Sequence, residues 1–202
     1  KASFAHIRRD GFATNIATGE DDGDKDLWAG RLAVQFTPND SVRLRINADI
    51  SQDSPDWSRT PARATPVFGI PASTDPFEIE ADFNGNSKLK TRGISGQLTI
   101  EPYAGLELKS ITAFRGMDYD TDLDLDATEF GFFGVYVSER QDQISQEFQV
   151  NYSDDRINAT GGLFYFREHD GPLRGLYGPG IGLVTGAFND EVNKIYAAYV
   201  QV

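Results

Sequence analysis

Residues 27–51 read LWAGRLAVQFTPNDSVRLRINADIS, and this stretch decides the fold class of the chain. In residues 41–51 every second side chain is apolar: Val42, Leu44, Ile46, Ala48 and Ile50. Residues 27–36 alternate in the same way: Trp28, Gly30, Leu32, Val34 and Phe36. Side chains of a β-strand point alternately to its two faces, so a period of two predicts two strands. Residues 37–40, Thr-Pro-Asn-Asp, supply turn chemistry between them, and the stretch predicts a β-hairpin.

Two further hairpins follow the same logic. Residues 89–101 and 106–115 alternate around a short connection at 102–105, and residues 142–152 and 156–167 alternate around 153–155. Single strands are expected at 1–9 and 191–202. The sequence therefore predicts an all-β fold, an antiparallel up-and-down meander of about eight strands.

The connections between these strands alternate strictly in length. Short turns at 37–40, 102–105 and 153–155 are separated by long segments at about 10–25, 52–88, 118–140 and 168–190. Outer-membrane barrels combine short turns at one end with long loops at the other, whereas long structureless loops are uncommon in compact soluble domains. The pattern favours a transmembrane β-barrel.

Aromatic spacing agrees with a membrane-spanning strand. Trp28 and Phe36 lie eight residues apart on one face of the same predicted strand. At roughly 3.3 Å per residue and a tilt near 40°, this spacing covers about 20 Å of height, close to the apolar band of roughly 25 Å between aromatic girdles. We therefore expect the apolar face to contact lipid and the charged face to line an aqueous interior. Within a bilayer only a closed sheet satisfies every backbone N–H and C=O group.

Composition excludes several classes of protein. No stretch approaches the eighteen or so apolar residues of a membrane-spanning helix, and the net charge of −12 argues against nucleic-acid binding. The chain has no Cys and only two His, without companions at ligand or triad spacing, so we expect no enzyme activity, catalytic residue, cofactor or metal site. The first residues lack both an initiating Met and the pattern of a signal peptide, which suggests a processed or excised chain.

Three stretches resemble a known family. They are residues 8–51 (RRDGFATNIATGEDDGDKDLWAGRLAVQFTPNDSVRLRINADIS), 108–124 (LKSITAFRGMDYDTDLD) and 143–168 (QISQEFQVNYSDDRINATGGLFYFRE). The first resembles the early barrel of TonB-dependent receptors, with an Arg-Asp-Gly-Phe strand end, an Asn and a Thr-Gly in the loop, and the Thr-Pro-Asn-Asp turn. The other two are similar to further barrel hairpins of that family.

The resemblance implies a barrel of 22 strands in the outer membrane of a Gram-negative bacterium, closed by an N-terminal plug and energised through TonB. The chain shows no plug and only about eight strands, so residues 1–202 are expected to be an internal piece of such a barrel. The implied function is import of a scarce, large solute such as a ferric siderophore. The implied partners are membrane lipid, TonB through the missing N-terminal part, and a small-molecule or metal-chelate substrate.

Aromatic residues of the long loops are the candidate ligand contacts: Trp57, Phe68, Phe77 and Tyr177. Two acidic runs, at 20–24 and at alternating positions from Asp118 to Asp126, contain the carboxylates that calcium prefers. Neither run has the spacing of an EF-hand, and charged runs usually face water. We therefore expect both to be solvated loop segments.

Two alternatives stay open at this point. An even strand count allows a self-contained eight-stranded barrel with a structural or adhesion role. A soluble β-domain with acidic calcium- or glycan-binding loops is the other. A plug upstream and further hairpins downstream would distinguish a receptor from a small barrel, and a need for detergent would exclude the soluble domain.

Overall fold

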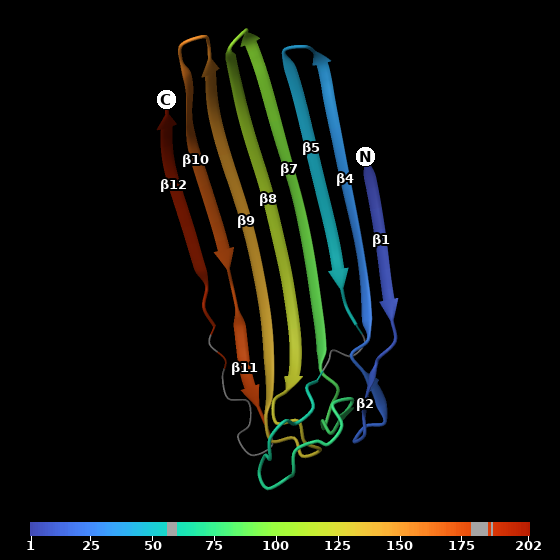
Figure 1. Ribbon diagram of the computed structural model, residues 1–202. Coiled ribbons are helices and arrows are strands. Elements are labelled where there is room, and N and C mark those ends of the chain that lie inside the picture. The colour runs from blue at the N-terminus through green and yellow to red at the C-terminus, as the bar shows by residue number, and fades with distance from the viewer. Residues whose placement is uncertain (56–59, 179–185, 187) are drawn as a thin grey trace.

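The computed structural model describes residues 1–55, 60–178, 186 and 188–202. Its strands are β1 (Ala2–Arg9), β2 (Ala13–Asn15), β3 (Glu20–Asp22), β4 (Lys25–Asn39), β5 (Val42–Asp53), β6 (Glu78–Ile79), β7 (Asn86–Tyr103), β8 (Leu106–Asp124), β9 (Gly134–Ser153), β10 (Asn158–Asp170), β11 (Leu173–Tyr177) and β12 (Glu191–Gln201). The large sheet has the order β1-β4-β5-β7-β8-β9-β10-β12, and β11 pairs with the far end of β9 (Figure 1). A second, three-stranded sheet has the order β3-β2-β6.

The predicted fold class is confirmed, because each long strand pairs antiparallel with its neighbour along the chain. The three tight turns lie together at one end of the sheet, and the long connections gather at the other (Figure 1). Both boundaries of one long connection were wrong. Residues 118–124 and 134–140, expected in a loop, belong to β8 and β9, so this connection contains only residues 125–133.

The register places the alternating side chains on two distinct faces. Ile46 pairs with Val34 of β4 and with Gly96 of β7, and Leu44 pairs with Phe36 and with Leu98. The apolar residues of neighbouring strands therefore share one face, which we call the apolar face. Nothing in the described part of the chain covers it: Phe4 and Tyr196 are each 74% exposed. A contiguous exposed apolar surface of this extent is unusual for a soluble protein.

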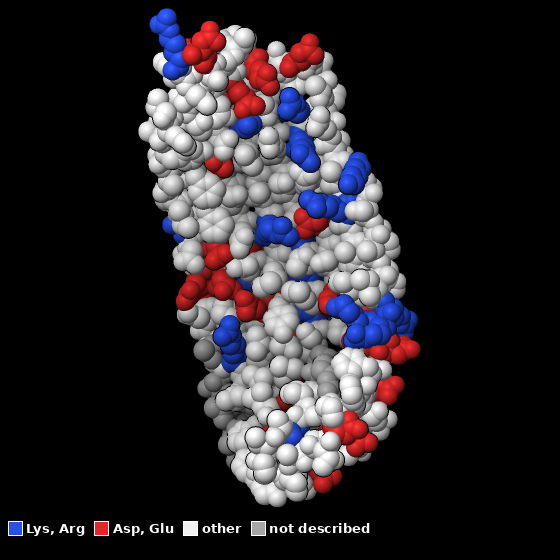
Figure 2. All heavy atoms as spheres, viewed as in Figure 1, with Lys and Arg blue, Asp and Glu red and all other residues white. Residues whose placement is uncertain are grey.

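The opposite face, which we call the polar face, carries charged and amide side chains along the strands (Figure 2). Arg115 of β8 reaches across β7 to Asp49 of β5, with 3.1 Å between Nη2 and Oδ2. Gly93 lies between them in the register, and a β-carbon there would approach Oδ1 of Asp49 to 3.1 Å. The absence of a side chain at Gly93 leaves room for this ion pair.

The edge of the apolar surface runs obliquely across the sheet. Going toward the long loops, the first charged side chain on the apolar face is Asp26 on β4 but Lys194 on β12. Six successive pairings connect Lys194 to Leu32 of β4, which is six residues from Asp26. The edge therefore shifts by one residue per strand. With a rise of roughly 3.3 Å per residue and a strand spacing of roughly 4.8 Å, it makes an angle of about 35° with the rows of paired residues. Strands of transmembrane barrels tilt by about 35–45° to the membrane normal. A flat apolar layer that crosses strands with this tilt would have an oblique edge of the same kind.

The apolar layer also has the height of a bilayer core. On β5 it extends from Val42 to Ile50. These eight residue steps measure roughly 26 Å along the strand and about 21 Å in height at the angle derived above. The longest strands, β7, β8 and β9, continue well beyond this layer toward the long loops.

Beyond the layer the apolar face becomes a network of ion pairs, which explains the alternating aspartates of β8. The guanidinium of Arg92 on β7 contacts Asp118 of β8 at 2.9 Å and Asp142 of β9 at 3.3 Å. Ser138 of β9 donates a hydrogen bond of 2.6 Å to Asp120. The aspartates share one face, as expected from alternation, but cations and hydroxyls of both neighbouring strands offset their repulsion.

Three polar side chains interrupt the apolar layer and satisfy one another. Thr112 donates a hydrogen bond of 2.5 Å to Oε1 of Gln146, and Nε2 of Gln146 donates to Ser110 at 3.1 Å. Polar groups placed in hydrocarbon need such internal partners, because no water is present there to replace them. Their mutual pairing is compatible with a lipid-facing position.

The sheet does not close on itself within the described residues. β1 pairs only with β4 and β12 only with β10, so both edges present unpaired backbone groups. This arrangement does not correspond to a self-contained eight-stranded barrel. Among the described residues there is also no helix long and apolar enough to cross a membrane.

Replacing Gly116 by Ala tests the ion-pair network. A β-carbon at this position would lie 2.8 Å from Nε of Arg92, so the guanidinium must move away from Asp118 and Asp142. We expect a loss of about 1 kcal/mol in unfolding free energy, the usual scale for exposed ion pairs. Gly96→Ala is the matched control, because its β-carbon meets nothing within 4 Å, and it should be neutral or slightly stabilising. Equal unfolding midpoints in denaturant for the two variants would contradict this role of Gly116.

Candidate ligand-binding loops

The long connections form an organised layer at one end of the sheet (Figure 1). The small sheet ties the first connection to the second: β2 pairs antiparallel with β3 and parallel with β6, which follows β5 in the chain. Its apolar centre is small and consists of Ala13, Ile79 and Ala81, all buried. Polar side chains therefore supply much of what holds this layer together.

Asn15 is the central polar group of the small sheet. It is fully buried, and its Nδ2 donates to the carbonyl of Ala81 at 3.0 Å and to Oδ1 of Asn84 at 2.6 Å. Asn84 also accepts from the hydroxyl of Thr18 and donates to the carbonyl of Asp21. Buried amides are stable only when paired in this way. The network locks the first connection onto the second.

Arg63 links the second connection to the third. Its side chain is almost completely buried, and Nε donates to the carbonyl of Pro71 at 2.7 Å. Nη1 donates to the carbonyl of Ala127, and Nη2 contacts Oε2 of Glu80 at 2.5 Å. An unpaired buried guanidinium would be very costly, so each of these acceptors is needed to keep Arg63 inside the layer.

Two aspartates at the loop end of β8, beyond the apolar layer, shape the connection 125–133. Oδ1 of Asp124 accepts the backbone N–H groups of Asp126 and Ala127, and Asp126 accepts those of Thr128 and Phe133. Asp124 and Asp126 are buried, so the expectation that this acidic run is solvated was wrong for these two residues; Asp124 is only 3% exposed. Burial, reinforced by the charge of Asp126, raises the pKa of Asp124 to about 6. Burial followed by Asp126 also raises the pKa of Asp82 in the neighbouring connection.

Phe68 occupies a strained position at the tip of a tight hairpin. Val67 and Ile70 exchange two backbone hydrogen bonds of 3.0 and 2.9 Å, and the residues between them, Phe68 and Gly69, have φ angles of 50° and 83°. Two consecutive positive φ angles are typical of a type I′ turn, where Asn, Asp or Gly is preferred. A bulky residue in this conformation costs on the order of 1 kcal/mol, and such strain concentrates at ligand clamps and active sites.

The ring of Phe68 is directed toward the third connection. Its centroid lies 4.8 Å from that of Phe132 and 6.0 Å from that of Phe133, and Phe130 lies 5.9 Å from Phe132. We call these four side chains the phenylalanine cluster. All four remain substantially exposed, Phe68 at 64%. Aromatic surfaces held in place but open to solvent are suited to stack against an apolar or aromatic ligand.

The other predicted contacts have different surroundings. Phe77 is exposed and packs edge-on against Phe12, with centroids 6.3 Å apart. Tyr177 on β11 donates a hydrogen bond of 2.6 Å to Asp122, which favours a structural role. Trp57 lies outside the described residues. Of the three predicted contacts that the structure describes, only Phe68 belongs to the phenylalanine cluster. Its three partners come from the segment Phe-Gly-Phe-Phe at 130–133, which no sequence pattern had marked.

The acidic run at 20–24 differs from expectation in one respect. Asp22 of β3 is fully buried rather than solvated, and its Oδ2 accepts the backbone N–H of Thr60 at 2.9 Å. Within the described ranges, no group of three or more His, Cys, Asp or Glu residues is arranged to hold a metal ion.

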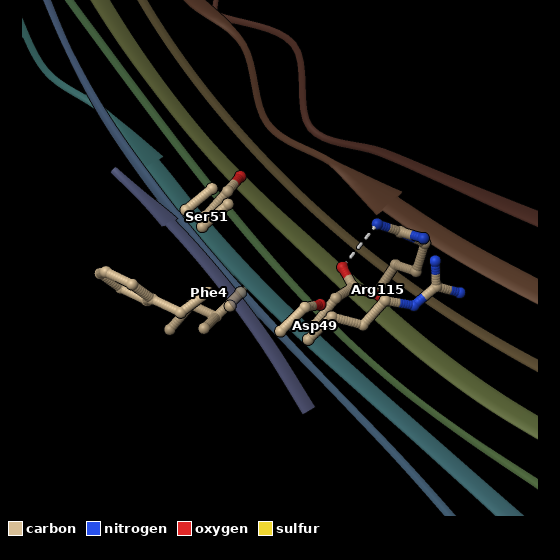
Figure 3. A pocket seen from close by; sticks show the side chains of 10 residues that line it. Phe4, Asp49, Ser51 and Arg115 are labelled. Atoms are coloured by element: carbon tan, nitrogen blue, oxygen red, sulfur yellow. Dashed lines mark hydrogen bonds and ion pairs between the residues drawn. The ribbon is translucent and has the colours of Figure 1, made fainter. Parts of the chain in front are cut away.

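A shallow hollow of about 460 Å³ lies on the sheet beside the Asp49–Arg115 pair (Figure 3). Its wall includes Ser51 and Arg31, whereas the ring of Phe4 extends away from the ion pair. The hollow is open to solvent and its wall mixes apolar and polar groups, so it does not have the enclosed form of a small-molecule site.

Comparison with known proteins shows the fold of this sheet. No protein-family model and no curated protein matches the sequence. Among solved structures, the ferric yersiniabactin uptake receptor FyuA from Yersinia pestis superposes with a TM-score of 0.67 at 14% sequence identity. The fold of this chain is therefore similar to that of part of FyuA. The match covers 98% of this chain and 38% of FyuA, so the chain spans well under half the length of that receptor. This structural neighbour is a transport protein and not an enzyme.

Substitutions of Phe68 separate backbone strain from ring contacts. Phe68→Asn and Phe68→Val both remove the ring, but Asn tolerates a positive φ and β-branched Val does not. We expect the hairpin at 67–70 to open more easily in the Val variant, by about 1–2 kcal/mol. Amide hydrogen exchange at Ile70 measures this difference. Equal protection in the two variants would mean that the backbone at position 68 is unstrained.

The raised pKa of Asp124 predicts a pH-dependent loop. A carboxyl group with a pKa of about 6 when folded and about 4 when unfolded contributes its full stabilisation below pH 4 and loses it as pH rises through 6. After correction for intrinsic rates, amide exchange in residues 125–133 should increase between pH 5 and pH 7. Asp124→Asn keeps an acceptor for the two backbone N–H groups without the charge, and should remove the increase. A variant that kept the full pH dependence would exclude Asp124 as its source.

Proposed function

We propose that the chain is a section of the barrel wall of an outer-membrane uptake receptor, and that this receptor imports a scarce, large solute with energy delivered through TonB. The observation that carries the proposal is the oblique edge of the apolar layer. This edge makes an angle of about 35° with the rows of paired residues, which agrees with the tilt of barrel strands to the membrane normal.

The uncovered apolar face supports a membrane location. It has the height of a hydrocarbon core, and the charged side chains on it lie beyond the layer, among them Arg92, Asp118 and Asp142. Burying such a face in lipid removes apolar surface from water at roughly 25 cal/mol per Å². The outer membrane of a Gram-negative bacterium is the natural location for a spanning sheet of this kind.

The open edges support a larger barrel. A spanning sheet with unpaired edges would expose backbone N–H and C=O groups to hydrocarbon, so β1 and β12 require further strands beside them. The match covers 38% of FyuA, which agrees with a chain that is one part of a larger barrel. In this proposal residues 1–202 form roughly the first third of the barrel, and the plug and the remaining strands belong to the rest of the protein.

The loop layer supports solute capture. Its connections are cross-linked by Asn15, Arg63 and the capped aspartates, so the phenylalanine cluster is held in place before a ligand arrives. Preorganised aromatic surface lowers the entropic cost of binding. We assign first contact with the solute to Phe68 and its cluster partners, with Phe77 and Trp57 as further contacts. FyuA is described as an uptake receptor for ferric yersiniabactin, and a ferric siderophore is the corresponding substrate class here.

Transport by the complete receptor tests the energy source and the substrate class together. The receptor would be expressed in a Gram-negative host with and without TonB and supplied with a panel of radiolabelled ferric chelates. We expect one chelate class to bind at the cell surface in both hosts but to accumulate only in the host with TonB. Accumulation that does not need TonB, or no binding of any chelate, would contradict the proposal.

A charge placed on either face of β4 tests the membrane orientation. Val34 lies on the apolar face and Ala33 on the polar face of the same strand. Val34→Arg should lower the unfolding free energy of the complete receptor in phospholipid vesicles by about 2–4 kcal/mol, because the charge enters hydrocarbon. Ala33→Arg, the adjacent control, should change it by less than about 1 kcal/mol. Equal effects in chemical denaturation would mean that neither face of β4 contacts lipid.

A further inference from the structure

Two cations of the apolar face lie side by side, and neither has a counter-ion among the described residues. Arg167 of β10 and Lys194 of β12 are direct register partners, and each is the first charged side chain beyond the apolar layer on its strand. Like charges in this position destabilise a sheet. No hydrogen bond or ion pair from the described residues involves either side chain, although carboxylates are abundant elsewhere on this end of the sheet.

The nearby ionisable groups are already engaged. Asp142 of β9 lies diagonally from Arg167, but its Oδ1 contacts Nη2 of Arg92 at 3.3 Å. His169 is two residues beyond Arg167 on the same face and is paired with Asp190. The Arg167–Lys194 pair thus forms a local concentration of positive charge on a chain whose net charge is −12.

The side chains on the turn side of this pair are those of a membrane interface. Tyr165 and Tyr196 are register partners one step closer to the turns, with ring centroids 5.1 Å apart. Leu163 and Ala198 follow them within the apolar layer. Tyrosine rings prefer the level of lipid headgroups, where one end of the ring is apolar and the other is wet. The two cations therefore lie at or just outside headgroup level.

We propose that Arg167 and Lys194 bind the phosphate of a lipid headgroup in the leaflet on the long-loop side, while the acyl chains of that lipid lie against Leu163 and Ala198. The inference rests on the proposed function, because it requires this face to contact a bilayer. A phosphate supplies the negative charge that the described residues do not, and a guanidinium and an ammonium side by side can donate to its oxygens together. A lipid with a phosphate headgroup is then a specific ligand of the barrel and not only a component of the surrounding bilayer.

Lipid retention by the complete receptor tests this site. The receptor is purified in a neutral detergent, mixed with phosphatidic acid or with diacylglycerol of the same acyl chains, and examined by native mass spectrometry. The variant is Arg167→Gln/Lys194→Gln. The matched control is Arg31→Gln/Arg45→Gln, which removes the same charge from two cations of the polar face that also lack partners in the described structure.

We expect the wild-type receptor and the polar-face control to retain phosphatidic acid and to release diacylglycerol. The Arg167/Lys194 variant should bind phosphatidic acid about 25-fold more weakly, since each interfacial cation contributes roughly fivefold. Equal retention by the variant, equal retention of diacylglycerol, or displacement of phosphatidic acid by millimolar inorganic phosphate would overturn the lipid site. A receptor that stays dissolved without detergent would instead contradict the proposed function itself.

Discussion

The structure depends on one constraint: a backbone that crosses hydrocarbon must pair all of its N–H and C=O groups within the protein. A closed antiparallel sheet meets this requirement through its backbone alone, so the side chains of its two faces are free to differ in polarity. The apolar face of this sheet is uncovered over a height of about 21 Å and ends along a line that crosses the strands obliquely. In the proposed function, the alternation, the uncovered face and the tilt all follow from a single planar layer of lipid.

Beyond this layer, charged side chains replace apolar ones on the same face of the strands. β8 carries Phe114 within the apolar layer and Asp118 just beyond it, on the same face. There the strands are held together by cross-strand ion pairs such as Arg92–Asp118, and the loop layer by buried hydrogen bonds around Asn15 and Arg63. The phenylalanine cluster, with the strained backbone of Phe68, is presented on this polar framework.

Local pattern was sufficient to predict the sheet. Each of the eight long strands appears where alternation indicates it, and Thr37-Pro38-Asn39-Asp40 correctly marks the end of the first hairpin. The boundary of β8 was missed because alternating aspartates resemble a solvated loop when seen alone. The cations that make them compatible with a strand, Arg92 and Arg140, come from neighbouring strands. Alternation in the sequence indicates which face of the sheet a residue occupies, but not which side chains of the neighbouring strands lie beside it.

The loop site was less predictable, for the same reason. Phe68 could be selected as an aromatic residue in a long loop, whereas its contact with Phe132 depends on how two connections fold against each other. Asn15 lies within the segment that resembles TonB-dependent receptors, but its burial depends on Asn84, 69 residues away in the chain. Contacts between loops are set by tertiary structure, and no periodicity in the sequence encodes them.

The most direct measurement of the central claim is an accessibility scan of β5. The chain contains no Cys, so single Cys substitutions from Val42 to Ser51 can each carry a nitroxide label in the complete receptor within phospholipid vesicles. Collisions with oxygen, which is concentrated in lipid, should be frequent at even-numbered positions, and collisions with a water-soluble nickel complex should be frequent at odd-numbered positions. Strong nickel accessibility at Leu44, Ile46 and Ala48, or no alternation at all, would contradict the claim that the apolar face meets lipid.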